Sequence, residues 1–272
     1  MGDVNNFLAD FYFFRNTFCE NFREELFGEV AGLKCGEYQN APQFLSVCVE
    51  CGKFYLYLQI MKSIEKIIAR QLLEISAVCL NVEQPFTWAS GWRSPIYCDN
   101  RKILSYPKMR KLIYESLARL IGQHFPSVEV IAGVATGAIA HGILVAEQME
   151  KPFIYIRSSA KGHGLANTIE GELKAGARVV VIEDLISTGS SSLRAVEAVR
   201  KAGAEVLGMA AIFSYNFIST RRSFENADCE LYTLTNYLTL IEEAKQCDYI
   251  KDSDMATLER WREAPDKWGN EG

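Results

Sequence analysis

The chain has 272 residues, of which 49% are hydrophobic and 23% are charged, and its formal net charge is -5. This composition is typical of a globular protein with room for one large domain and an appendage. The sequence has neither a run of 18 apolar residues nor a cluster of Lys and Arg, so we expect no membrane span and no nucleic-acid partner. Its first residues do not resemble a secretory signal, which predicts a cytoplasmic protein whose eight cysteines are reduced.

Residues 1–60 differ in composition from the rest of the chain. They hold 13 of the 31 aromatic residues and four of the eight cysteines. A zinc site is one interpretation, but only Cys48 and Cys51 form a close CxxC pair and a second such pair is missing. We favour the other interpretation, an atypical extension from a misassigned start codon, because Met61 precedes an amphipathic run. The main domain is then predicted over residues 61–272.

From residue 61 onward, helical and strand-like patterns alternate along the chain. The spacing of apolar residues predicts helices over 64–75, 108–125, 139–149, 191–202, 238–244 and 254–268, and strands over 128–134, 153–156, 179–182, 206–213 and 231–234. Such alternation is typical of an α/β fold with a mostly parallel twisted sheet flanked by helices. The strand over 179–182 is apolar throughout, as expected for a strand buried on both faces.

The segment VVVIEDLISTGSSS, residues 179–192, is the most informative motif. Glu183 and Asp184 follow the predicted strand, at the sheet edge where ligands bind in open α/β folds. Residues 187–191 and the next helix offer hydroxyls, backbone N–H groups and a positive helix end to a phosphate, and Gly189 permits close approach. The two carboxylates suit ribose hydroxyls and positive charge developing on the sugar. A solvated strand end with a Ser-rich helix cap is the alternative interpretation.

This motif resembles the fingerprint of type I phosphoribosyltransferases, with Glu183 in place of the usual first acid. The resemblance implies a type I phosphoribosyltransferase fold with a small N-terminal hood region. It also implies that the phosphate of phosphoribosyl pyrophosphate lies on the loop over residues 187–191. The residues that it implies for binding this substrate are Arg157, Lys161, His163, Glu183, Asp184, Leu185, Ile186, Ser187, Thr188, Gly189, Ser190 and Ser191.

Three further segments resemble orotate phosphoribosyltransferases in particular. The first, PFTWASGWRSPIYCDNRKILSYP over residues 85–107, resembles the family's N-terminal substrate region, although a polar hairpin with an aromatic edge is an alternative. The second, YIRSSAKGHGLANTIEG over residues 155–171, resembles a lid over pyrophosphate, although a solvated basic loop is an alternative. The third, AGVATGAIAHG over residues 132–142, resembles the loop that binds pyrophosphate.

The resemblance also implies roles for single residues. Lys161, His163 and Asp184 are implied as catalytic residues, the first two through leaving-group stabilisation or proton transfer, and Ser187 is implied as an orotate-binding residue. In the family the lid reaches into the site of the partner subunit, which implies a homodimer with shared active sites.

Some positions depart from the family pattern. Ala89, Ser158 and Gly137 stand where many members carry Lys, and the segment after Phe213 lacks an Arg that contacts orotate in many members. These departures bear on how the carboxylate of orotate is held.

The implied reaction transfers the phosphoribosyl group from phosphoribosyl pyrophosphate to orotate, giving orotidine 5′-phosphate and pyrophosphate in pyrimidine nucleotide biosynthesis. Mg²⁺ is the implied cofactor, held by substrate oxygens and water, so we predict no set of protein metal ligands. Two alternatives remain: a phosphoribosyltransferase for another base, and a non-catalytic regulator that senses phosphoribosyl pyrophosphate.

Overall fold

The structure is a computed structural model that describes three stretches of the chain, residues 64–88, 90–157 and 168–268. The predicted extension over residues 1–60 lies outside the described residues, as do Ala89, Ser158, Lys161 and His163. None of the helices within the three described stretches combines the length and the apolar character needed to cross a membrane.

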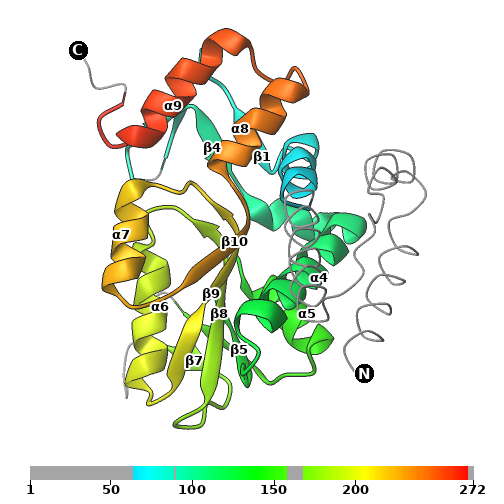
Figure 1. Ribbon diagram of the computed structural model, residues 1–272, viewed down its shortest axis with the longest axis vertical. Helices are drawn as coiled ribbons and strands as arrows, with labels where there is room; N and C mark the ends of the chain where they lie inside the picture. The colour runs from blue at the N-terminus through cyan, green and yellow to red at the C-terminus, as the bar shows by residue number, and fades with distance from the viewer. Residues whose placement is uncertain (1–63, 89, 158–167, 269–272) are drawn as a thin grey trace, which may run out of the picture. The chain divides into compact units, whose positions relative to one another are not determined.

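The central sheet has six strands in the order β10–β9–β8–β5–β6–β7 (Figure 1). In that order the strands cover Leu231–Asn236, Glu205–Ser214, Arg178–Ile186, Val130–Val134, Phe153–Ile156 and Ile169–Glu170. The first five are parallel, and β7 pairs antiparallel with β6. The mostly parallel sheet is therefore confirmed.

The strand order places a topological switch point between β5 and β8. After β5 the chain moves to one side of the sheet to form β6, and after β8 it moves to the other side to form β9 and β10. The connections leave the carboxyl ends of β5 and β8 in opposite directions, which opens a crevice there. Parallel α/β sheets bind their ligands at this kind of crevice.

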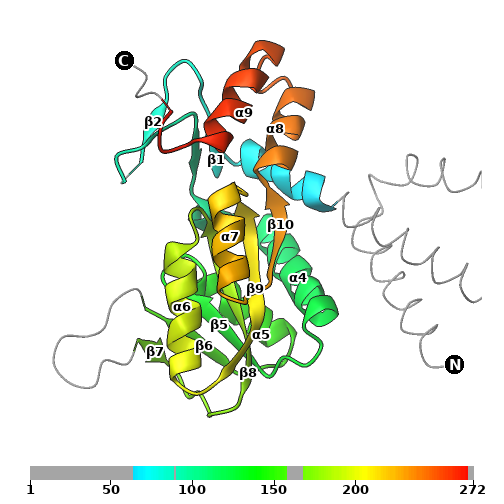
Figure 2. The same cartoon turned by 60° about the vertical axis from the view of Figure 1, so that its left-hand side comes forward.

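Helices cover both faces of the sheet (Figures 1 and 2). One face carries α6 and α7 and the other carries α4 and α5, and these helices cover Ser190–Lys201, Ile218–Asn226, Pro107–His124 and Ile139–Gln148. Val179 and Val181 of β8 pack with Val196 and Val199 of α6 in one apolar cluster. Val180 is also fully buried, and because neighbouring side chains of a strand alternate, it faces the other helical layer. The prediction of a strand buried on both faces is confirmed.

A hood of smaller elements lies at one end of the sheet (Figure 2). It contains the helical residues 64–74, the pairs β1 with β4 and β2 with β3, and helices α8 and α9. The labelled elements cover Val78–Leu80, Ile96–Cys98, Phe86–Thr87, Arg93–Ser94, Tyr237–Gln246 and Met255–Glu263.

Within the hood, residues 64–88 contact the C-terminal helices α8 and α9. Arg70 donates from Nε and Nη2 to the buried Oε2 of Glu243, over 3.2 and 2.8 Å. Trp88 meets Trp261 of α9 edge to face, with ring centroids 5.7 Å apart. Trp261 is fully buried, so the C-terminal helix is docked as expected. Segments about 170 residues apart in the chain therefore stabilise one another here.

Several boundaries differ from the predicted ones. Strand β8 runs to Ile186, so Glu183 and Asp184 lie within the strand rather than after it. The strand continues because β9 pairs with it beyond the apolar run, with Glu183 opposite Ala211 and Leu185 opposite Phe213. Helix α7 and the short strands of the hood were not predicted, since their apolar residues are too few for a clear period. Within residues 85–107, β2 and β3 pair antiparallel in a short hairpin, with Phe86 opposite Ser94 and Thr87 opposite Arg93.

Candidate active site

A cavity of about 640 Å³ opens at the carboxyl ends of β5 and β8. All four motifs found in the sequence contribute to its wall. The described lining residues include Cys98, Asp99 and Arg101 from the first segment, Ala135, Thr136 and Gly137 from the third, Arg157 and Thr168 from the second, and Glu183, Asp184, Leu185 and Ser191 from the phosphate motif. Because these segments are far apart in the chain, their meeting at the switch point marks the candidate active site.

The two acidic side chains of the motif have different surroundings. Glu183 is only 6% exposed, and its Oε2 accepts a hydrogen bond of 3.0 Å from the Ser192 hydroxyl at the start of α6. Asp184 is half-buried and faces the loop after β5. Glu183 therefore ties β8 to α6, whereas Asp184 presents its carboxylate to the cavity.

Burial also changes the acidity of this pair. It raises the pKa of the Glu183 carboxyl well above its usual value, and the charge of Asp184 adds to the rise. Burial likewise raises the pKa of Asp184, whereas nearby Arg101 lowers it. The site therefore favours cations or hydroxyl donors next to these carboxylates.

The loop over residues 187–191 has the predicted form of an anion cradle. Gly189 has a φ of 79° and lies directly before the first residue of α6, and Thr188, Ser190 and Ser191 are exposed around it. Thr220 of α7 donates a 2.6 Å hydrogen bond to the Ser187 carbonyl, which holds the loop in place. Hydroxyls and free N–H groups at a helix N-terminus suit a phosphate.

Not every predicted contact residue presents its side chain to a ligand. Ile186 is fully buried in the apolar cluster beneath α6, so its side chain cannot contact a ligand. Arg157 lines the cavity, and its Nε lies 3.0 Å from Glu170 Oε1 in an ion pair. Its backbone N–H also donates to the Thr168 carbonyl over 2.8 Å, so two residues near the ends of the predicted lid segment are bonded to each other at the cavity wall.

The structure accounts for two of the departures from the family pattern. A Cβ added at Gly137 would collide with the Asp184 carboxylate, so a Lys here requires Asp184 to move. In the segment after Phe213, Tyr215 is buried, with ring centroids 5.0 Å from Trp88 and 5.7 Å from Trp261. The segment after Phe213 therefore packs into the hood, and Tyr215 offers no positive charge to orotate.

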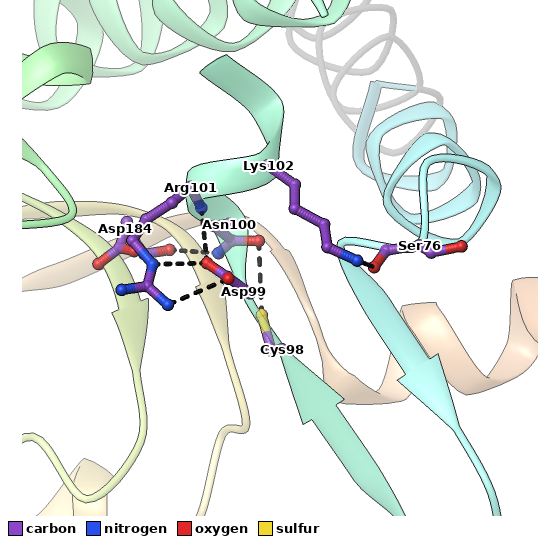
Figure 3. Close-up of polar contacts among 7 residues, drawn as sticks. All are labelled: Ser76, Cys98, Asp99, Asn100, Arg101, Lys102 and Asp184. Carbon is purple, nitrogen blue, oxygen red and sulfur yellow. Dashed lines mark hydrogen bonds and ion pairs between the residues drawn. The ribbon is translucent and has the colours of Figure 1, made fainter. Parts of the chain in front are cut away.

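Three consecutive residues of the segment over residues 85–107, for which the resemblance implied no individual role, complete the wall near Asp184 (Figure 3). Asn100 is buried at the start of the 3₁₀ helix η1 (Asn100–Ser105), and its Nδ2 donates to the Asp184 carbonyl over 2.6 Å. Asp99 and Arg101 form an ion pair at the cavity, with 2.6 Å between Asp99 Oδ1 and Arg101 Nε. The charged run DNR directly after a β-rich segment is the sequence signal that indicates this cluster.

Comparison with known proteins identifies the class. Residues 100–230 match the phosphoribosyl transferase domain family. The chain is 55% identical over 209 residues to orotate phosphoribosyltransferase of Porphyromonas gingivalis, a match that covers 77% of this chain and 100% of that one. It is 54% identical over 207 residues to the Listeria innocua orotate phosphoribosyltransferase, covering 76% of this chain and 99% of the relative.

Solved structures agree with this class. The crystal structure of orotate phosphoribosyltransferase from Aeropyrum pernix has a TM-score of 0.59 at 26% identity, covering 68% of this chain and 99% of that one. The structure of Leishmania donovani UMP synthase has a TM-score of 0.63 at 26% identity, covering 73% of this chain and 42% of that one.

The fold, the cavity at its switch point and the matched domain define a type I phosphoribosyltransferase. Within that class, the extent of identity to curated relatives decides the family. The chain belongs to the orotate phosphoribosyltransferase family.

Proposed function

We propose that this chain transfers the phosphoribosyl group from phosphoribosyl pyrophosphate to orotate, giving orotidine 5′-phosphate and pyrophosphate in pyrimidine nucleotide biosynthesis. The observation that carries the proposal is the convergence of Asp184, the phosphate loop and the segment over residues 85–107 on one cavity. The choice of orotate is supported by the names of relatives that are more than half identical to the chain.

The sugar phosphate binds along β8 and the start of α6. The hydroxyls and N–H groups of residues 187–191 bind the 5′-phosphate, and Ser187 also contacts orotate. Asp184 accepts hydrogen bonds from the ribose hydroxyls and stabilises the positive charge that develops on the sugar ring as the bond to pyrophosphate breaks. Glu183 also accepts a hydrogen bond from a ribose hydroxyl. In addition, its hydrogen bond with Ser192 fixes the start of α6 relative to β8.

The pyrophosphate leaves on the side of the cavity formed by the loop after β5 and by Arg157. Backbone N–H groups near Thr136 and Gly137 suit an anion, and both residues line the cavity. In this proposal Lys161 and His163 supply leaving-group stabilisation or proton transfer from the partner subunit of a homodimer. Light scattering of the purified protein tests the dimer, and a monomer at assay concentrations contradicts it.

Mg²⁺ is part of the proposal. Within the described residues, no group of three or more His, Cys, Asp or Glu side chains could hold a metal. Asp184 nevertheless brings carboxylate oxygens to the cavity, and Mg²⁺ prefers carboxylate and phosphate oxygens with several waters retained. These donors fit an ion that arrives with the diphosphate, where it neutralises charge on the leaving group.

We also propose that the protein works in the cytoplasm. The four cysteines among the described residues, Cys79, Cys98, Cys229 and Cys247, are all free thiols, which suits a reducing compartment. Fractionation of cells that express the tagged chain checks this location.

The activity is tested with purified protein, orotate, phosphoribosyl pyrophosphate and Mg²⁺, following the loss of orotate absorbance. We expect turnover with orotate and little with uracil or hypoxanthine, and chelation of Mg²⁺ should stop the reaction. Faster turnover with hypoxanthine than with orotate would favour a phosphoribosyltransferase for another base. Binding of phosphoribosyl pyrophosphate without turnover of any base would favour the regulator.

A further inference from the structure

Four cationic side chains among the described residues line the cavity: Arg101, Arg157, Arg194 and Lys201. Arg194 and Lys201 belong to α6, and Arg157 follows β6. Of these four, Arg101 is the one that the β4–η1 segment contributes, and it shares the cavity wall with Asp184 (Figure 3). None of the roles proposed above uses it.

The guanidinium of Arg101 is held in one orientation but remains open to a ligand. Its Nε donates to Asp99 Oδ1 over 2.6 Å and its Nη2 donates to Oδ2 over 3.0 Å. Asp99 also accepts the backbone N–H of Arg101 over 3.2 Å, which fixes the start of η1. The side chain is still 63% exposed, and Asp99 uses two of the five N–H donors of a guanidinium. A preorganised fork of this kind suits a carboxylate or a phosphate.

The negative charges of the cavity wall and of the substrates are stabilised by a cation such as Arg101. Glu183 and Asp184 lie next to each other in the wall, and Asp99 adds a third carboxyl group. Orotate brings a carboxylate and phosphoribosyl pyrophosphate brings a diphosphate, and like charges at short range in a partly buried site repel strongly. Arg101 offsets this repulsion at the point where Asp99 and Asp184 approach the cavity.

We propose that Arg101 binds an anionic oxygen group of a substrate, either the carboxylate of orotate or the diphosphate of phosphoribosyl pyrophosphate, and that Asp99 is its positioning residue. This inference rests on the proposed function, which supplies the two anions. It also assigns a substrate-binding role to one of the four cations of the cavity, at a site where Gly137 and Tyr215 provide none.

The experiment compares Arg101→Gln and Arg101→Lys with the parent chain. Steady-state KM is measured for each substrate, and equilibrium binding of phosphoribosyl pyrophosphate is measured without orotate. Arg178→Gln is the matched control, because Arg178 forms a similar exposed ion pair, 2.8 Å from Glu129, at the opposite end of β8. Thermal melting of every variant checks that the chain is folded.

We expect Arg101→Gln to raise the KM for one substrate by at least tenfold, with Arg101→Lys intermediate and Arg178→Gln within twofold of the parent. Asp99→Asn should raise the same KM by a smaller factor and leave kcat within twofold. A rise for orotate assigns the carboxylate, and a rise for phosphoribosyl pyrophosphate with weaker binding assigns the diphosphate. Both KM values within twofold of the parent in a folded Arg101→Gln variant overturn the inference. An inactive parent chain instead contradicts the proposed function, and the binding arm still reports on Arg101.

Discussion

The two walls of the cavity are built in opposite ways. The phosphate wall is local, since β8, the loop over residues 187–191 and α6 follow one another in the chain and carry their own anion site. The wall beneath the hood is assembled from distant segments, because Asn100 reaches across to Asp184. The hood above this wall is held together by the contacts of Trp88 and Tyr215 with Trp261. The difference teaches that substitutions in the local wall should damage chemistry first, whereas substitutions at the buried aromatic contacts that hold the hood together should damage stability first.

The largest expected effect lies in the hood, for Trp261→Ala. Trp261 is fully buried and packs against four other aromatic rings, Trp88, Tyr215, Phe217 and Tyr237. Removal of a large buried ring should lower the free energy of unfolding by about 3–5 kcal/mol. Chemical denaturation measures this loss. Trp261→Phe keeps most of the packing and serves as the control, and an equal loss in both variants would mean that ring size is not the cause.

Asp184→Asn should have the next largest effect, on turnover rather than on stability. Asn has nearly the same shape, but it removes the negative charge that stabilises the developing positive charge on the sugar. Loss of one such electrostatic contact lowers kcat by about 10²–10³-fold. Single-turnover kinetics with orotate measure the change, and the melting temperature should stay close to that of the parent. A variant that retains near-parental kcat would remove Asp184 from the catalytic role.

Gly189→Ala probes the backbone of the local wall. The residue has a φ of 79°, and a Cβ here would lie 2.7 Å from Phe224 Cε2. A left-handed backbone costs a non-glycine residue about 1–2 kcal/mol, and the loop must also shift away from Phe224. We expect a lower melting temperature and weaker binding of phosphoribosyl pyrophosphate, measured by calorimetry.

Gly176→Ala is the matched control for this strain, because Gly176 has a φ of 78° with nothing within 4 Å of the added Cβ. It should lower stability without weakening binding. Equal binding losses in the two variants would show that the loop geometry at Gly189 is not specific to the phosphate.

The smallest expected effect is a pH dependence at Glu183. Its pKa is raised in the folded chain, so the native state holds a proton that the unfolded chain releases, and stability falls as pH rises from the usual Glu pKa through the raised value. Glu183→Gln should remove this loss, about 1.4 kcal/mol for each unit by which the pKa is raised. Melting curves across this pH window should show that the melting temperature of Glu183→Gln rises relative to that of the parent as pH rises. Parallel curves would contradict the burial argument.

The local wall was predictable because its determinants are contiguous. The apolar run over 179–182, two acids, small hydroxyl residues and Gly189 give the strand, the ligand edge and the helix start within fourteen residues. The exact end of β8 was not predictable, since Glu183 and Asp184 stay in the strand only through pairing with β9. Propensity describes single segments, whereas pairing depends on a neighbour that the segment does not contain.

By itself, the sequence determined the α/β class, the order of the main elements, the phosphate loop and the family resemblance, since each depends on local periodicity or on a short motif. Only the tertiary structure decided which residues share the cavity. The bond from Asn100 to Asp184, the collision of an added Cβ at Gly137 with the Asp184 carboxylate and the burial of Tyr215 all arise from contacts between distant segments. Such contacts depend on how the sheet order and the hood bring chain segments together, and no local pattern encodes that distance.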